Sequence, residues 1–180
     1  MKGIILSEFV EFLESSLGPD QAQIVIDKSG VGSGGAYSRV GHYDYQELIQ
    51  LLTHAAAESE IEASELVNKF SQHLFMVFRR DYSVFFEGVD SAAHMLSQID
   101  NHIHVEVKKL YPDAELPKFE YTNTGESLVL DYSSPRPLAA VAKALVMACI
   151  QYFGDKEKLV SSEISEDQCS AKFVIAVSSN

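Results

Sequence analysis

The N-terminal part of the chain carries apolar residues three and four positions apart, which is the spacing of amphipathic helices. One such helix is predicted to begin almost at Met1 and to end at Gly18-Pro19, with acidic residues between its apolar positions. A short helix over about 20–28 and a loop rich in Gly and Ser over 29–38 are expected next. Two more helices are expected, one from a cap at Asp44 and one from about Ser64 to Phe78.

A longer helix is predicted from Asp90 or Ser91 to Tyr111, because either of the first two can cap it and Pro112 disfavours helix at Tyr111. His104 lies inside this helix. Its apolar positions at helical spacing are Met95, Leu96, Ile99, Ile103, Val107 and Leu110.

After Pro117 the apolar period changes to two, which predicts a β-hairpin over about 119–132 with a turn at 123–125. The segment 138–153 is apolar on nearly every side and is expected to be a buried helix, and a second hairpin over about 159–177 follows. We expect an α+β fold of one domain over 1–180: an N-terminal helical part, 1–60, packed on a C-terminal part, 61–180, with an antiparallel sheet and an inserted helix.

The composition of the chain excludes some classes of binding partner. The formal net charge of -12 argues against nucleic acid and anionic membranes, which attract clustered Lys and Arg. No apolar stretch reaches the length of a membrane span or forms a signal peptide, and Cys149 and Cys169 are too few for a disulfide framework. We therefore expect a cytoplasmic protein. No nucleophile elbow or other catalytic motif is present, so we expect no enzyme activity.

Tyr132, Ser134 and Arg136 are spaced two residues apart, so along an extended strand their side chains leave from one face. Arginine offers a forked donor set that matches a carboxylate, and the two hydroxyls add donors. The trio therefore suits a ligand with closely placed carboxylates. The alternative is that Tyr132 packs in the core, Ser134 turns the chain before Pro135, and Arg136 is exposed.

His104 is a second candidate, because neutral imidazole is a common axial ligand of haem iron. The alternative is a surface histidine or one that caps a helix. A small metal ion shared with His102 is a further alternative, but residues two apart on a helix point in different directions.

Taken together, these residues resemble a known family along essentially the whole chain. The matching segments are Met1-Lys2-Gly3-Ile4-Ile5 at the start, the run from Ile103 to Pro112 around His104, and Tyr132-x-Ser134-x-Arg136. The sequence resembles the haem–nitric oxide/oxygen binding (H-NOX) family, bacterial relatives of the haem domain of soluble guanylate cyclase.

The resemblance implies haem b between the helical part and the sheet. It implies that His104 ligates the iron and that Tyr132, Ser134 and Arg136 hold the propionates. Pro117 matches a proline that presses on the haem plane. Ile5 matches an apolar residue of the N-terminal helix that helps to distort the haem, and we expect Ile5 to be buried.

The resemblance also indicates which gas the haem iron would bind. Oxygen-binding members carry a tyrosine nine residues after the motif tyrosine, and this position is Val141 here. The other distal candidates, Phe9, Leu74 and Phe78, are apolar too, and Tyr152 is too far along its helix. With no distal donor expected, nitric oxide is favoured over oxygen, since one lost hydrogen bond weakens affinity by roughly one to two powers of ten.

The implied function is a haem-based gas sensor that binds nitric oxide, and also carbon monoxide. Nitric oxide is expected to weaken the bond between iron and His104 and free the helix from Asp90 to Tyr111. No kinase, cyclase or coiled-coil segment is visible, so the output is expected to pass to a separate protein, a histidine kinase or a cyclic-dinucleotide enzyme. The alternative function is a haem-free interaction module or a site for another carboxylated ligand.

Overall fold

The computed structural model describes residues 1–154 and 156–177. Residues 155 and 178–180 of the predicted domain lie outside the described residues. The chain divides into two compact units, Met1–Leu74 and Phe75–Asn180, and the division falls inside a helix, later than residue 60. No helix in the described ranges is both long and apolar enough to cross a bilayer.

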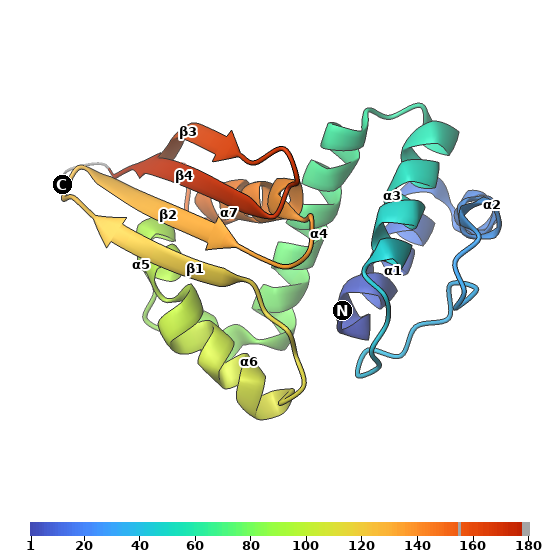
Figure 1. Ribbon diagram of the computed structural model, residues 1–180, viewed down its shortest axis with the longest axis horizontal. Helices are drawn as coiled ribbons and strands as arrows, with labels where there is room; N and C mark the ends of the chain where they lie inside the picture. Colours follow the sequence, from blue (N-terminus) through green and yellow to red (C-terminus); the bar gives the residue numbers. More distant parts are fainter. Residues whose placement is uncertain (155, 178–180) are drawn as a thin grey trace. The chain divides into compact units, whose positions relative to one another are not determined.

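The first unit is helical. It contains α1 (Gly3–Leu17), α2 (Pro19–Ser29), α3 (Gln46–Ser59) and the larger part of α4 (Ala63–Asp81). These four helices confirm the helices predicted for this part of the chain, and Figure 1 shows them in blue to green. Helix α1 packs against α2 and α3. The side chains that are at most 1% exposed in this core include Leu6, Phe9, Leu13, Leu48, Leu51, Leu66 and Phe70.

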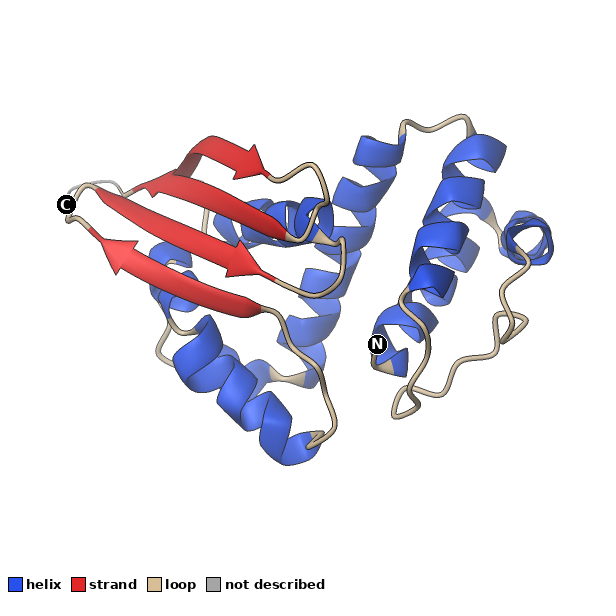
Figure 2. Ribbon diagram, viewed as in Figure 1, coloured by secondary structure: helices blue, strands red, loops and turns tan. Residues whose placement is uncertain are grey.

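The second unit is built on a four-stranded antiparallel sheet in the order β1-β2-β4-β3 (Figure 2). Its strands are β1 (Lys118–Asn123), β2 (Ser127–Ser133), β3 (Lys158–Ile164) and β4 (Ser170–Ala176), so both predicted hairpins are confirmed. Helix α7 (Ala139–Tyr152) joins β2 to β3 and packs on one sheet face, where Leu128, Leu130, Phe173 and Ile175 are at most 1% exposed.

Between α4 and β1 the chain is not the single helix that the sequence predicts. It forms a short 3₁₀ turn η1 (Ser83–Phe86), helix α5 (Ala92–Ser97), a π-helical turn η2 (Ile99–Ile103) and helix α6 (His104–Leu110). Ser91 provides the cap, since its side chain accepts the His94 N–H at 3.1 Å. The π turn shifts the helical register, and α6 consequently has no fully buried residue.

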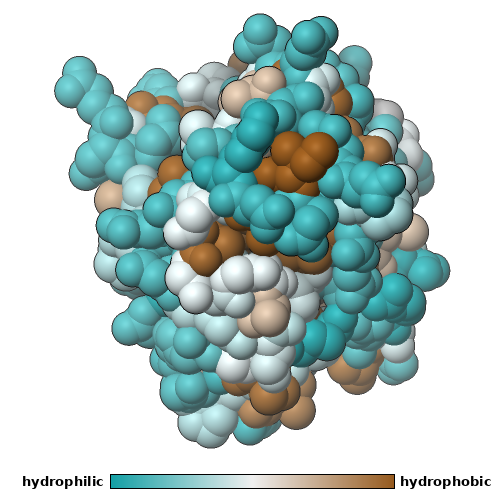
Figure 3. Space-filling view, turned by 90° about the vertical axis from the view of Figure 1, so that its right-hand side faces the viewer, coloured by the Kyte–Doolittle hydropathy of each residue, from teal (hydrophilic) through white to brown (hydrophobic). Residues whose placement is uncertain are grey.

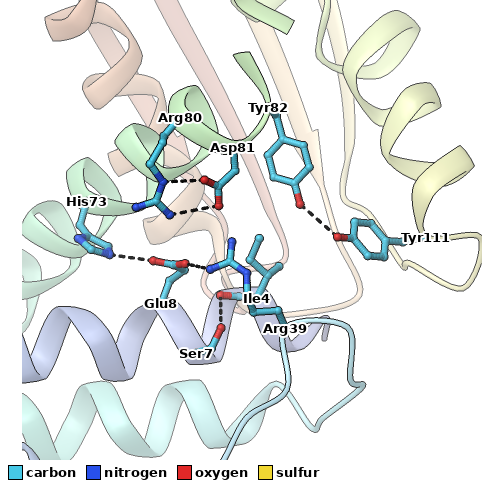
Figure 4. A network of polar contacts seen from close by, with 9 residues as sticks. All are labelled: Ile4, Ser7, Glu8, Arg39, His73, Arg80, Asp81, Tyr82 and Tyr111. Atoms are coloured by element: carbon cyan, nitrogen blue, oxygen red, sulfur yellow. Dashed lines mark hydrogen bonds and ion pairs between the residues drawn. The ribbon is translucent and has the colours of Figure 1, made fainter. Parts of the chain in front are cut away.

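A buried carboxylate joins three segments of the first unit. Glu8 of α1 is fully buried, and it pairs with Arg39 of the 30–45 loop and with His73 of α4, whose Nε2 lies 3.1 Å from its Oε2 (Figure 4). A buried charge is tolerated only when it is paired and hydrogen-bonded. The loop and the two helices are therefore held together by the same side chain.

The face drawn in Figure 3 is largely hydrophilic, with apolar colour confined to small patches. Among the described residues of the first unit, the large apolar side chains classed as exposed are Ile24 and Val40. Such scattered apolar residues are usual on a globular domain and need no partner to explain them.

Substituting Arg39 is expected to destabilise the protein, because Arg39→Met removes the cation that pairs with the buried carboxylate of Glu8. We expect a loss of about 2–3 kcal/mol in the free energy of unfolding, measured by urea denaturation. The control is Lys28→Met, which removes a solvent-exposed ion pair with Glu58 (2.8 Å) in the same unit and should cost less than about 1 kcal/mol. Equal effects of the two substitutions would contradict the role assigned to Glu8.

Candidate functional site

His104 is the first residue of α6 and comes directly after the π turn. Its ring Nδ1–H donates to Asp100 Oδ1 at 2.7 Å, and its side chain is 19% exposed. Burial lowers the pKa of His104 below the usual histidine value, although the hydrogen bond and charge of Asp100 act in the opposite direction. The ring is therefore neutral at physiological pH, the form in which imidazole ligates metals.

Asp100 is the residue that orients this histidine, and the sequence analysis did not identify it. One carboxylate oxygen accepts from His104, and the other accepts the backbone N–H of Phe119 on β1 at 3.0 Å. With Nδ1 carrying the proton, Nε2 keeps its lone pair, and the described part of the chain offers it no hydrogen bond. The spacing of four residues from Asp100 to His104 was the available signal.

The π turn explains how these groups meet. The Ile103 N–H bonds to Gln98 O at 3.1 Å and the His104 N–H bonds to Ile99 O, each spanning five residues instead of four. The wider turn changes the direction of the residues that follow, and π turns of this kind often occur at functional sites. It also explains why Leu110, on the predicted apolar face, is 59% exposed.

Tyr132 lies on the buried face of β2 with Leu128 and Leu130, as predicted, and is 4% exposed. Burial raises the pKa of Tyr132, so its hydroxyl stays protonated and can donate. The rings of Tyr132 and His104 both contact Phe119, with centroid distances of 5.2 and 6.0 Å. The second unit thus brings the strand motif and the helical histidine to the same aromatic side chain.

Strand β2 ends at Ser133, so Ser134 and Arg136 lie beyond the regular strand. The Ser134 side chain is nevertheless a hydrogen-bond partner of the Tyr132 hydroxyl, and the charge of Arg136 acts on the same group; both lower the pKa of Tyr132 against the larger effect of burial. The Ser134 hydroxyl accepts the Arg136 backbone N–H at 3.1 Å, a local turn that competes with the extended strand ahead of Pro135. Arg136 follows this turn, and its side chain is only 11% exposed.

The Arg136 guanidinium already holds a carboxylate. It contacts the side chain of Glu115, and its Nη1–H donates to the Glu115 carbonyl at 2.9 Å. The two terminal nitrogens of the guanidinium thus bind one carboxylate oxygen and the backbone carbonyl of the same residue. Glu115 lies in the loop before β1 together with the half-buried Pro117, and the sequence analysis did not single it out.

The apolar candidates fall in both units. In the first, Phe9 is 0% and Leu74 1% exposed, and the Phe9 ring meets Phe70 edge-on at 4.8 Å. Ile5 is half-buried, not buried as expected, because its neighbours Ile4 and Leu6 take the inward positions of α1. In the second unit, Phe78 of α4 and Val141 of α7 are half-buried.

The alternatives weighed for other polar residues find little support. Tyr152 is engaged elsewhere, since its hydroxyl accepts from Arg79 and the Arg79 guanidinium lies 5.3 Å from its ring centroid. The ring of His102 contacts Phe85 at 6.2 Å. No group of three or more His, Cys, Asp or Glu within the described ranges could hold a metal ion.

Comparison with known proteins agrees with this arrangement. A family model described as "Haem-NO-binding" matches residues 2–160. The chain belongs to the haem–nitric oxide binding (H-NOX) family. No curated protein gives a significant match to the chain.

Solved H-NOX structures share the whole fold. The Fe(II) unliganded H-NOX protein of K. algicida is 33% identical, with a TM-score of 0.89 over 100% of this chain and 98% of that one. The H-NOX of Shewanella woodyi, solved as an Fe(II)CO complex bound to IWP-051, is 31% identical with a TM-score of 0.81 over 99% and 95% of the two chains. An H-NOX protein of S. oneidensis at 24% identity and a TM-score of 0.82, covering 99% of this chain and 100% of that one, shares the fold. The α+β prediction is confirmed.

Replacing Asp100 is expected to weaken the fold around β1, because Asp100→Ala removes the acceptor of two hydrogen bonds at once. The expected loss is about 1–3 kcal/mol in the free energy of unfolding. Asp90→Ala is the matched control, since Asp90 also precedes a histidine by four residues (His94, 3.3 Å) but its side chain is 86% exposed. Urea unfolding should show little change for the control. A loss no larger than that of the control would contradict the bridging role of Asp100.

Proposed function

We propose that this protein is a haem-based sensor of nitric oxide in which His104 ligates the haem iron. The observation that supports this assignment best is the His104–Asp100 hydrogen bond, which places the ring proton on Nδ1 and leaves the Nε2 lone pair free, while burial lowers the pKa of the ring and keeps it neutral. Metal-ligating histidines typically donate their other ring N–H to such an acceptor. Membership of the H-NOX family makes haem the group to test first.

Haem b is proposed as the cofactor, with its propionates held by Tyr132, Ser134 and Arg136. The residues fit this group chemically: the tyrosine hydroxyl is protonated and the buried guanidinium pairs with the carboxylate of Glu115. A propionate would take the place of that carboxylate on Arg136. Pro117 and Ile5 are proposed to pack against the haem plane.

The ligand side is proposed to be lined by the apolar side chains of Phe9, Leu74, Phe78 and Val141. When bound, ferrous haem supplies an iron that takes nitric oxide or carbon monoxide. A lining of this kind excludes water and offers few donors, which favours nitric oxide over oxygen. The S. oneidensis and S. woodyi proteins were solved with nitric oxide and carbon monoxide respectively, which supports the same ligands here.

His104 is proposed to transmit the ligand state to the protein. Its ring is tied through Asp100 to the Phe119 N–H, so a change in the ring position is carried to the edge strand β1 as well as to α6. A bound ligand can shift the protein between two positions of the His104 ring only if it binds more tightly to one of them than to the other. We propose that a separate protein, a histidine kinase or a cyclic-dinucleotide enzyme of the cytoplasm, reads this change, and that the chain itself catalyses no reaction.

The visible spectrum tests the proposal. Protein expressed with adequate haem should show a Soret band that shifts when nitric oxide is added to the reduced form. His104→Ala should lose most of its haem, and added imidazole should restore the band because it replaces the missing ligand. His102→Ala is the control, two residues away on the π turn, and should load normally. No Soret band in the unmodified protein, or normal loading of His104→Ala without imidazole, would falsify the assignment.

A further inference from the structure

Phe119 is the side chain of β1 that points into the second unit. It is half-buried, whereas the other side chains of this strand are exposed. It packs at the margin of the apolar core of the unit. An aromatic ring is therefore directed inward at the start of an edge strand, and its contacts indicate its use.

The ring of Phe119 contacts two of the residues proposed to bind haem. Its centroid lies 6.0 Å from that of His104, with 52° between the ring planes, and 5.2 Å from that of Tyr132, with 59° between the planes. Tyr132 is also its register partner on β2. The backbone N–H of Phe119 donates to Asp100 at 3.0 Å, and all four residues belong to the second unit.

The hydrogen bond to Asp100 does not by itself fix the plane of the His104 ring. It holds Nδ1 at 2.7 Å, but one hydrogen bond lets the ring tilt, because the Cβ–Cγ torsion of histidine has broad wells. The lone pair of Nε2 lies in the ring plane, so a bond to a metal depends on the direction of that plane. A second contact restricts the tilt, and the ring of Phe119 provides one.

We propose that Phe119 is a positioning residue that fixes the plane of the His104 ring and thereby sets the strength of the bond from Nε2 to the haem iron. This inference rests on the proposed function. Because the same ring contacts Tyr132, it also relates the orientation of the histidine to the motif at which the propionates are proposed to bind. The role requires a rigid planar side chain, which an aliphatic residue does not supply.

The test is Phe119→Leu in the haem-loaded protein. This variant keeps the backbone N–H that donates to Asp100 and loses the aromatic contact with His104. In the resonance Raman spectrum of the unliganded ferrous protein, the iron–histidine stretching band should move to lower wavenumber and broaden. After addition of nitric oxide, the iron–His104 bond should be lost about twofold faster or more, in keeping with the weight of one aromatic contact.

Two further variants show whether the aromatic ring itself is responsible. Phe119→Tyr keeps the ring and should give the band and the rate of the unmodified protein. Tyr121→Leu makes the same kind of exchange at a 45% exposed position of the same strand and should change neither. An unchanged band and an unchanged rate in Phe119→Leu would overturn the inference, and so would equal changes in Tyr121→Leu.

Stability separates this role from a structural one. Phe119→Leu should lower the thermal midpoint of the unliganded ferrous protein slightly, because Phe119 is half-buried. A fall in the midpoint with an unchanged iron–histidine band would show that Phe119 supports only the fold, and would reject the proposal. If the unmodified protein shows no Soret band, the proposed function fails and this inference fails with it. Normal haem loading with no spectral effect of Phe119→Leu rejects only the role of Phe119.

Discussion

The carboxylate of Asp100 is the interaction on which the arrangement of the second unit depends most. It accepts the His104 ring N–H with one oxygen and the Phe119 backbone N–H with the other, at 2.7 and 3.0 Å. One side chain thereby determines the tautomer of the histidine and joins the helical segment to the edge of the sheet. Since Phe119 is the register partner of Tyr132, the same contact relates the histidine to the strand motif.

The carboxylates of Asp100 and Glu115 contact two of the proposed haem-binding residues, His104 and Arg136, in different ways. Asp100 holds a neutral ring, because the effect of burial, which lowers the pKa of His104, outweighs the opposite effect of the Asp100 hydrogen bond and charge. Glu115 pairs with Arg136, a permanent cation, at the end of the motif. In this acidic chain, with a net charge of -12, Asp100 therefore accepts from the neutral His104 ring and Glu115 pairs with the charged Arg136 guanidinium.

The parts of the fold that follow from side-chain periodicity could be predicted. The hairpin of β1 and β2 is encoded by alternating apolar residues around Asn123 and Gly125, and α1 by apolar residues at helical spacing. The π turn could not be predicted, since two five-residue hydrogen bonds leave no mark in the periodicity. The end of β2 at Ser133 could not be predicted from spacing, because it accompanies a bond from the Arg136 N–H to the Ser134 side chain.

The π turn before His104 has a consequence for how this segment can rearrange. A turn closed by five-residue hydrogen bonds holds one residue more than an α-helical turn closed at the same point. Shifting the His104 N–H from the carbonyl of Ile99 to that of Asp100 would return it to α-helical geometry. The Ile103 N–H would have to shift from Gln98 O to Ile99 O as well. Together the two exchanges amount to a rotation of about 100° and a rise of about 1.5 Å for the residues beyond. The difference between the two geometries at His104 is thus confined to the carbonyl partners of two neighbouring N–H groups.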